Sequence, residues 1–185
     1  SGCVCVTRVK NTLTFPAKFS LVAAMNPCPC GYFGDPEKEC RCTANEVFRY
    51  QKKISGPLLD RIDIQLEVPR IPIDELRKEK TENIEESFRK QVNAARHIQT
   101  ERFNKTHPKI YNNAEMTSGQ VDELVKLDPR AENFLKQALE KAFMSARGYY
   151  RLLRVAQTIA DLDISPIIKT EHLAEAFQYR LRANE

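Results

Sequence analysis

The stretch FPAKFSLVAAMNP, residues 15–27, contains a short continuous apolar run that ends in an Asn–Pro pair. An apolar run of this length, stopped by Asn26 and Pro27, predicts a buried strand over residues 19–25. Asn26 would then stand at the end of the strand, which is the edge where open α/β sheets bind ligands. Its amide could position a water molecule or contact a phosphate without adding charge. The alternative interpretation is that the Asn–Pro pair is only a turn.

The segments on either side of this run also predict strands. Residues 4–9 alternate and are β-branched, and Asn11-Thr12 is a turn signal before a second strand at residues 13–15. After a predicted helix at residues 44–54, IDIQLEV at residues 62–68 alternates between apolar and polar side chains. The front third of the chain is therefore expected to supply strands of an α/β core.

The pattern becomes helical after Pro72. We expect helices over residues 82–103, 121–127, 129–143, 146–162 and 171–181, four of them opened by a polar cap. These caps are Thr117, Asp128, Ser145 and Thr170. The prediction is an α+β chain with two domains, residues 1–72 and residues 73–185. The expected apolar core of the helical part comprises Phe88, Val92, Phe134, Leu152 and Val155.

Composition narrows the class of protein. The chain has 185 residues, 42% hydrophobic and 29% charged, as is typical of a globular protein. No apolar run approaches the roughly 20 residues that span a bilayer, and the first residues do not form a secretory signal. We therefore expect a cytoplasmic protein. The net charge of +4 does not by itself require a nucleic-acid partner.

The cysteines occur as three Cys-x-Cys pairs, and two of these pairs share one loop. Cys28 with Cys30 and Cys40 with Cys42 could place four thiolates around one Zn²⁺ ion. Cys-x-Cys is tighter than the commoner Cys-x₂-Cys spacing, so free surface thiols and oxidised pairs remain as alternatives. The three histidines are scattered and are interpreted as structural.

Two further segments carry possible chemistry. In SGPLLDRIDIQLEVP, residues 55–69, Arg61 precedes the predicted strand and could reach a phosphate across an interface, or could simply pair with Asp60 on the surface. In SARGYYRLLRVAQTIADL, residues 145–162, Arg147 and two later arginines share one helix face. The alternative for those arginines is a solvated basic stripe.

Taken together, residues 15–32, 55–69, 145–162 and HLAEAFQYR at 172–180 closely resemble the Mg-chelatase-like AAA+ ATPases of the ComM/YifB group. The resemblance implies the C-terminal strands of an AAA+ core followed by a helical lid. It implies that Asn26 is the sensor-1 residue, that Arg61 is an arginine finger acting on a neighbouring subunit, and that Arg147, with Arg154 as the alternative, is the sensor-2 residue. It further implies that the hairpin carrying Arg8 points toward a central pore.

The chain contains no G-x-x-x-x-G-K-[ST] segment, the loop that holds nucleotide phosphates. We therefore expect a fragment that does not hydrolyse ATP alone, from an ATPase that uses ATP and Mg²⁺. The resemblance implies a ring, a hexamer by family expectation, that acts on DNA in branch migration and natural transformation. The alternatives are the ATPase subunit of a metal chelatase and a standalone zinc-containing helical interaction module.

Overall fold

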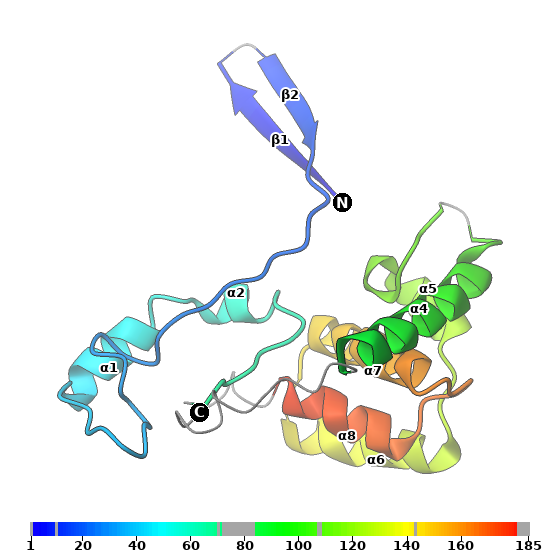
Figure 1. The fold of residues 1–185 in the computed structure, drawn as a ribbon. Helices are drawn as coiled ribbons and strands as arrows, with labels where there is room; N and C mark the ends of the chain where they lie inside the picture. The colour runs from blue at the N-terminus through cyan, green and yellow to red at the C-terminus, as the bar shows by residue number, and fades with distance from the viewer. Residues whose placement is uncertain are drawn as a thin grey trace. The chain divides into compact units, whose positions relative to one another are not determined.

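The computed structural model describes residues 2–9, 11–69, 71, 84–106, 109–142 and 144–180. The chain forms two compact units, Ser1–Lys53 and Ile54–Glu185. The first contains a two-stranded hairpin and one helix, and the second is helical (Figure 1), so the α+β class is confirmed. The predicted domain boundary at residues 72 and 73 lies outside the described residues and stays a prediction.

The hairpin consists of β1, Cys3–Arg8, and β2, Asn11–Pro16. The strands are antiparallel, with Cys3 opposite Pro16 and Arg8 opposite Asn11, which confirms both predicted strands. Every residue of both strands is exposed, so the described chain covers neither face of this hairpin.

The buried strand predicted over residues 19–25 is wrong. These residues form no strand, and Phe19 is 77% and Val22 95% exposed. A strand needs a neighbouring backbone to pair with, and no described segment pairs with this one. The strand predicted over residues 62–68 is wrong for the same reason. The Gln65 amide donates to the Tyr179 carbonyl at 3.0 Å, but no ladder follows.

Two short helices lie between these segments in the sequence. Helix α1, Ala44–Gln51, begins with a capping box, in which the Glu46 amide donates to the Thr43 hydroxyl and the Thr43 amide donates to the Glu46 carboxylate. It ends three residues earlier than predicted. Helix α2, Gly56–Leu59, is a single turn with Pro57 near its start.

The second unit continues with α4, Ile84–Phe103, the 3₁₀ helix η1, Asn113–Glu115, and α5, Ser118–Leu124. Three further helices follow: α6, Pro129–Ala142, α7, Ala146–Leu162, and α8, Thr170–Gln178. No helix among the described residues has the length and apolar character to cross a membrane.

The predicted helix caps are mostly confirmed. The Thr117 hydroxyl accepts from the Gln120 amide, and the Ser145 hydroxyl accepts from the Gly148 amide. The Asp128 carboxylate accepts from the Arg130 amide. Thr170 was wrongly predicted as a cap, because α8 already includes it and the amide of Lys169 donates instead to the His172 ring.

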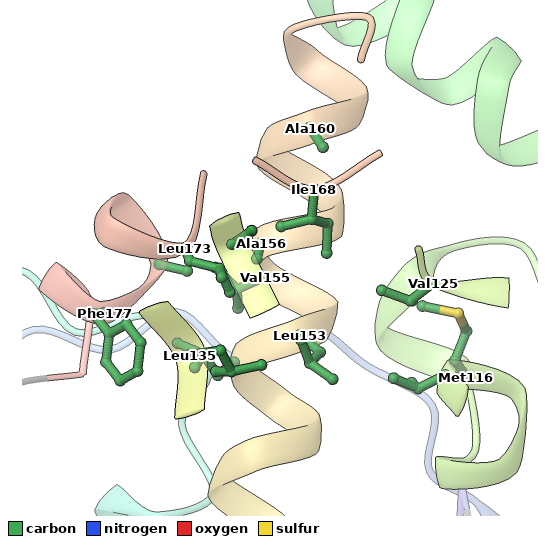
Figure 2. Packing of buried hydrophobic residues seen from close by; sticks show 14 of the residues in the cluster. Met116, Val125, Leu135, Leu153, Val155, Ala156, Ala160, Ile168, Leu173 and Phe177 are labelled. Carbon is green, nitrogen blue, oxygen red and sulfur yellow. The ribbon is translucent and has the colours of Figure 1, made fainter. Parts of the chain in front are cut away.

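Helix α7 lies at the centre of the core. Its residues Leu152, Ala156 and Ala160 are fully buried. Figure 2 shows Leu173 and Phe177 of α8 on one side of α7 and Met116 and Val125, which flank α5, on the other. Burying such large apolar side chains contributes about 1.5–3 kcal/mol each, so α7 is the main organiser of this unit.

Part of the predicted core is not buried. Leu152 and Val155 are buried and Phe134 packs against the cluster, but Phe88 is 60% and Val92 48% exposed. The reason lies in α4, whose buried residues are confined to its second half, at Ala95, Gln99 and Phe103. The described chain therefore leaves the apolar stripe in the first half of α4 uncovered.

A buried polar network joins α4, η1 and α7 around the fully buried Asp161. Its carboxylate accepts hydrogen bonds from Arg102 at 2.8 Å, Asn113 at 2.7 Å, Gln157 at 3.0 Å and Gln99 at 3.1 Å. Burial alone would raise the pKa of Asp161, but these donors and the Arg102 charge outweigh burial and lower it. The charge on Asp161 is therefore fully partnered inside the core.

Candidate functional site

The four cysteines of the 28–42 loop come together. Cys28 Sγ lies 3.4 Å from Cys30 Sγ and 3.7 Å from Cys40 Sγ, and Cys30 Sγ lies 3.6 Å from Cys40 Sγ. With Cys42, all four sulfur atoms lie within 4.8 Å of one another, and none forms a disulfide. A tetrahedral zinc site with bonds of about 2.3 Å has sulfur–sulfur edges of about 3.8 Å. The cluster is therefore close to the size that one Zn²⁺ ion requires.

Two glycines and a carboxylate shape this loop. Gly31 and Gly34 have φ values of +84° and +82°, which glycine adopts without steric cost. The Asp35 carboxylate accepts from the amides of Glu37 at 2.8 Å and Lys38 at 3.0 Å, which closes the distal turn. The chain then returns toward the first cysteine pair.

The local electrostatics favour a cation among the thiols. Backbone N–H groups of Tyr32 and Arg41 point at Cys30 and lower its pKa to about 6. The pKa of Cys42 is raised to about 12, because burial and the neighbouring thiols outweigh the hydrogen bond it receives from the backbone of Cys30. The pKa of Cys40 is also raised, despite a backbone hydrogen bond from Cys42. Four thiolates this close repel one another, and a divalent cation would remove that repulsion.

A second group of potential ligands, Asp163, Glu171 and His172, lies in the helical unit. The Lys169 ammonium group is 3.4 Å from the Glu171 carboxylate and 4.0 Å from the Asp163 carboxylate. Both acids therefore already form ion pairs with a lysine of the protein. The buried His172 ring accepts from the Lys169 amide and lies 3.3 Å from Asp163. We interpret this group as the contact between the end of α7, at Asp163, and the start of α8 rather than as a metal site.

The three residues expected to handle phosphate are all exposed. Asn26 lies directly before the cysteine loop in the first unit. Arg61 follows α2 in the second unit, and its Nη1 donates to the Pro57 carbonyl. Arg147 occupies the first turn of α7. Solvent-exposed side chains of this kind are available to a ligand or to a neighbouring molecule.

The sequence did not indicate how the other arginines are used. Arg151 pairs with Asp63 at 3.1 Å and Arg180 pairs with Asp60 at 3.7 Å, so Asp60 pairs with Arg180 and not, in the described structure, with Arg61. The side chains of Arg151 and Arg180 are only 19% and 9% exposed. The interpretation of Arg151 as part of a solvated stripe is therefore wrong. The only sequence signal for these pairs is that two acids, Asp60 and Asp63, stand within two residues of Arg61.

Comparison with known proteins identifies the family. Residues 1–76 match the model for magnesium chelatase, subunit ChlI, and residues 82–180 match the model for the C-terminal part of that subunit. The chain is 40% identical to YifB of Escherichia coli and 38% identical to competence protein ComM of Haemophilus influenzae, each over 181 residues. It is 34% identical to YifB of Salmonella typhimurium over the same length.

These alignments cover 97% of the chain but 34% of each relative, so the chain spans about a third of their length. The matches include the segments that carry Asn26, the cysteine pairs, Arg61 and Arg147. The chain belongs to the Mg-chelatase-like AAA+ ATPase family that includes YifB and ComM.

Proposed function

We propose that the chain is the sensor-and-lid half of an oligomeric, ATP-driven motor that acts on DNA. The observation that carries this proposal is the continuous match of both parts of the chain to the magnesium chelatase family and to a relative named competence protein ComM. Competence is the uptake and use of DNA, which favours a DNA substrate. The motor would be cytoplasmic and a ring, with a hexamer as the expected form.

Three exposed residues would act on Mg²⁺-bound ATP in the complete ring. Asn26 would contact the γ-phosphate or the attacking water, Arg61 would act on ATP bound by the next subunit, and Arg147 would contact the nucleotide phosphates. In phosphoryl transfer a protein mainly positions groups and neutralises developing charge. Arginine suits the two charged roles because it stays ionised and offers a forked set of donors. The exposure of Arg61 and Arg147 supports these roles.

Substitution of Arg61 tests this proposal in the complete protein. Arg61→Ala should lower ATP turnover by roughly 10³–10⁵-fold, the usual effect of losing an arginine finger, while ATP binding is retained. Arg130→Ala, at an exposed position on α6, is the matched control and should leave turnover unchanged. Equal loss of binding and turnover in Arg61→Ala would contradict a role in trans. The 185-residue chain alone should show no Mg²⁺-dependent hydrolysis.

The substrate can be tested separately. Stimulation of ATP hydrolysis by branched or single-stranded DNA, together with DNA remodelling, would support the DNA motor. Stimulation only by a porphyrin-loaded partner would support the chelatase alternative that the family name suggests. The cysteine pairs favour the DNA-acting group, because the resemblance places Cys-x-Cys pairs in the ComM-like proteins and a short acidic connection in the chelatase subunit.

We also propose that Cys28, Cys30, Cys40 and Cys42 hold one Zn²⁺ ion. The observation that carries this is the cluster of four sulfur atoms within 4.8 Å of one another. The ion would be a structural staple, since four protein ligands leave no open position for catalysis. It would fix the loop that directly follows Asn26 in the sequence.

Elemental analysis of the chain purified without chelators tests the metal. We expect one zinc per chain, and loss of stoichiometric zinc in Cys40→Ser. Cys5→Ser is the matched control, because Cys5 lies on the exposed hairpin and is not part of the cluster. Zinc well below one equivalent, with four titratable thiols in the loop, would favour free surface cysteines.

A further inference from the structure

The turn that carries Arg61 is attached to the helical unit by two ion pairs. Asp63 Oδ1 lies 3.1 Å from Arg151 Nη1, and Asp60 Oδ1 lies 3.7 Å from Arg180 Nη2. The two acids stand one residue before and two residues after Arg61. Their partners come from α7 and from the residues that follow α8, so the turn contacts the bundle at two separate points.

The arginines of these pairs are the buried members. The side chain of Arg180 is 9% exposed and that of Arg151 is 19% exposed, whereas those of Asp60 and Asp63 are 44% and 50% exposed. A guanidinium group cannot lose its proton to escape burial, so it needs an opposite charge nearby. The two carboxylates are the charges that the described structure places there.

A third arginine increases this need. Arg154, one turn beyond Arg151 on α7, is half-buried, and burial lowers its pKa even though Asp63 acts in the opposite direction. One buried nitrogen atom on each of Arg151, Arg154 and Arg180 has no acceptor in hydrogen-bond geometry within the described part of the chain. The cluster thus combines three cations with two anions, so each carboxylate faces an excess of positive charge.

Backbone contacts complete the attachment. The Gln65 amide donates to the Tyr179 carbonyl at 3.0 Å, and the Gln65 side chain donates back to the Leu59 carbonyl at 3.2 Å. The Arg61 side chain remains exposed, although the residues on either side of it are paired with the bundle. The turn is therefore held from both ends, while the one arginine between the two acids stays available to a neighbouring molecule.

We propose that Arg151 and Arg180 are positioning residues that hold the Asp60–Asp63 turn on the helical unit and so set the place of Arg61. This inference rests on the proposed role of Arg61 in the ATPase. Its consequence is a direct connection along α7, because Arg147 and Arg151 lie one turn apart on the same helix. A movement of the lid in response to bound nucleotide would then move the arginine finger that serves the next subunit.

Hydrogen exchange of the Gln65 amide tests the attachment in the chain itself, without any ATPase activity. Its acceptor is Tyr179, so the amide exchanges when the turn leaves the bundle. Asp63→Asn and Arg151→Gln should each speed exchange by roughly tenfold, the effect of losing one partly buried charged contact. Arg130→Gln, which removes an exposed arginine from α6, should change nothing.

A charge swap makes this test specific. Asp63→Arg combined with Arg151→Asp should restore much of the protection, as a double-mutant cycle requires of a direct pair. Asp60→Asn provides the same test for the pair with Arg180. The Asp60 carboxylate is exposed, so its replacement should not unfold the chain, and far-UV circular dichroism checks that each variant remains folded. Unchanged Gln65 exchange in Asp63→Asn and Asp60→Asn would overturn the proposal.

The complete protein separates this proposal from the role of Arg61. Arg151→Gln should lower kcat while ATP affinity is kept, and the charge swap should recover kcat. If Arg61→Ala stops hydrolysis but Arg151→Gln does not slow it, the positioning role fails and the finger stands. If Gln65 exchange accelerates as expected but Arg61→Ala leaves hydrolysis intact, the attachment stands and the proposed role of Arg61 fails.

Discussion

Replacement of Asp161 by Asn should strongly destabilise the helical unit. The wild-type carboxylate is fully buried and accepts hydrogen bonds from four side chains, among them Arg102, whose own side chain is 14% exposed. Asp161→Asn keeps the shape of the side chain but leaves the Arg102 guanidinium without its counter-charge. It also places the new amide N–H₂ group among side chains that themselves donate hydrogen bonds. Breaking one partner of a buried ion pair costs about 3–5 kcal/mol, a large share of the ~5–15 kcal/mol that stabilises a typical domain.

The effect should depend on pH in a defined direction. Because the folded pKa of Asp161 is lowered, its contribution to stability is complete above the unfolded value of about 3.9 and is lost as pH falls through the folded pKa. The difference in free energy of unfolding between the wild type and Asp161→Asn should therefore be largest near neutral pH and should shrink below about pH 4.

Urea denaturation followed by circular dichroism at pH 7 and pH 3 measures both quantities. Glu123→Gln, at an exposed position on α5, is the control and should stay within about 0.5 kcal/mol of the wild type. A loss below about 1 kcal/mol at pH 7 in Asp161→Asn, or a loss that does not change with pH, would refute the electrostatic reasoning.

Three further predictions concern the lid, the core and the metal. In the complete protein, Arg147→Ala should weaken nucleotide binding or turnover without lowering the melting temperature; a melted domain, with the nucleotide defect appearing instead in Arg154→Ala, would reassign the role. Leu152→Ala should cost about 2–5 kcal/mol in urea denaturation and Phe88→Ala under about 1 kcal/mol, and equal losses would show that the first half of α4 is covered. Zinc should be released at low pH, because protons compete for the thiolates, or by strong chelators. After release, amide exchange should increase in residues 28–42 while the helical content stays unchanged. Unfolding of the bundle on release would contradict a local role of the metal.

The features predicted correctly from the sequence are those that depend on near neighbours. A threonine followed three residues later by a glutamine placed Thr117 at a helix start without reference to the rest of the fold. Alternation over residues 4–9 similarly located the first strand of the hairpin, although Asn11 and Thr12, predicted as the turn, belong to β2 and pair with Arg8 and Thr7. The cysteine cluster belongs to the same class, because both pairs lie in one short loop.

The errors arise where structure depends on a partner distant in the sequence. Alternation and apolar runs show that residues 19–25 and 62–68 suit a strand, but only a neighbouring backbone makes a strand, and none pairs with them in the described chain. Helical periodicity placed Phe88 on an apolar face, but it could not show how far along α4 the contact with α7 extends. The pairs of Arg151 and Arg180 were missed because each joins residues far apart in the sequence.

The fully buried face of α7 gives the helical unit a mechanical property. Helix α7 has 17 residues and is therefore a rod about 25 Å long. One face of this helix is fully buried, at Leu152, Ala156 and Ala160. The helix can therefore neither slide nor rotate against its neighbours without opening voids in a close-packed interior. Force applied at its first turn is then transmitted as a tilt of the whole unit, and a tilt of about 10° displaces the far end by roughly 4 Å. The helical bundle would therefore move as one rigid body instead of deforming.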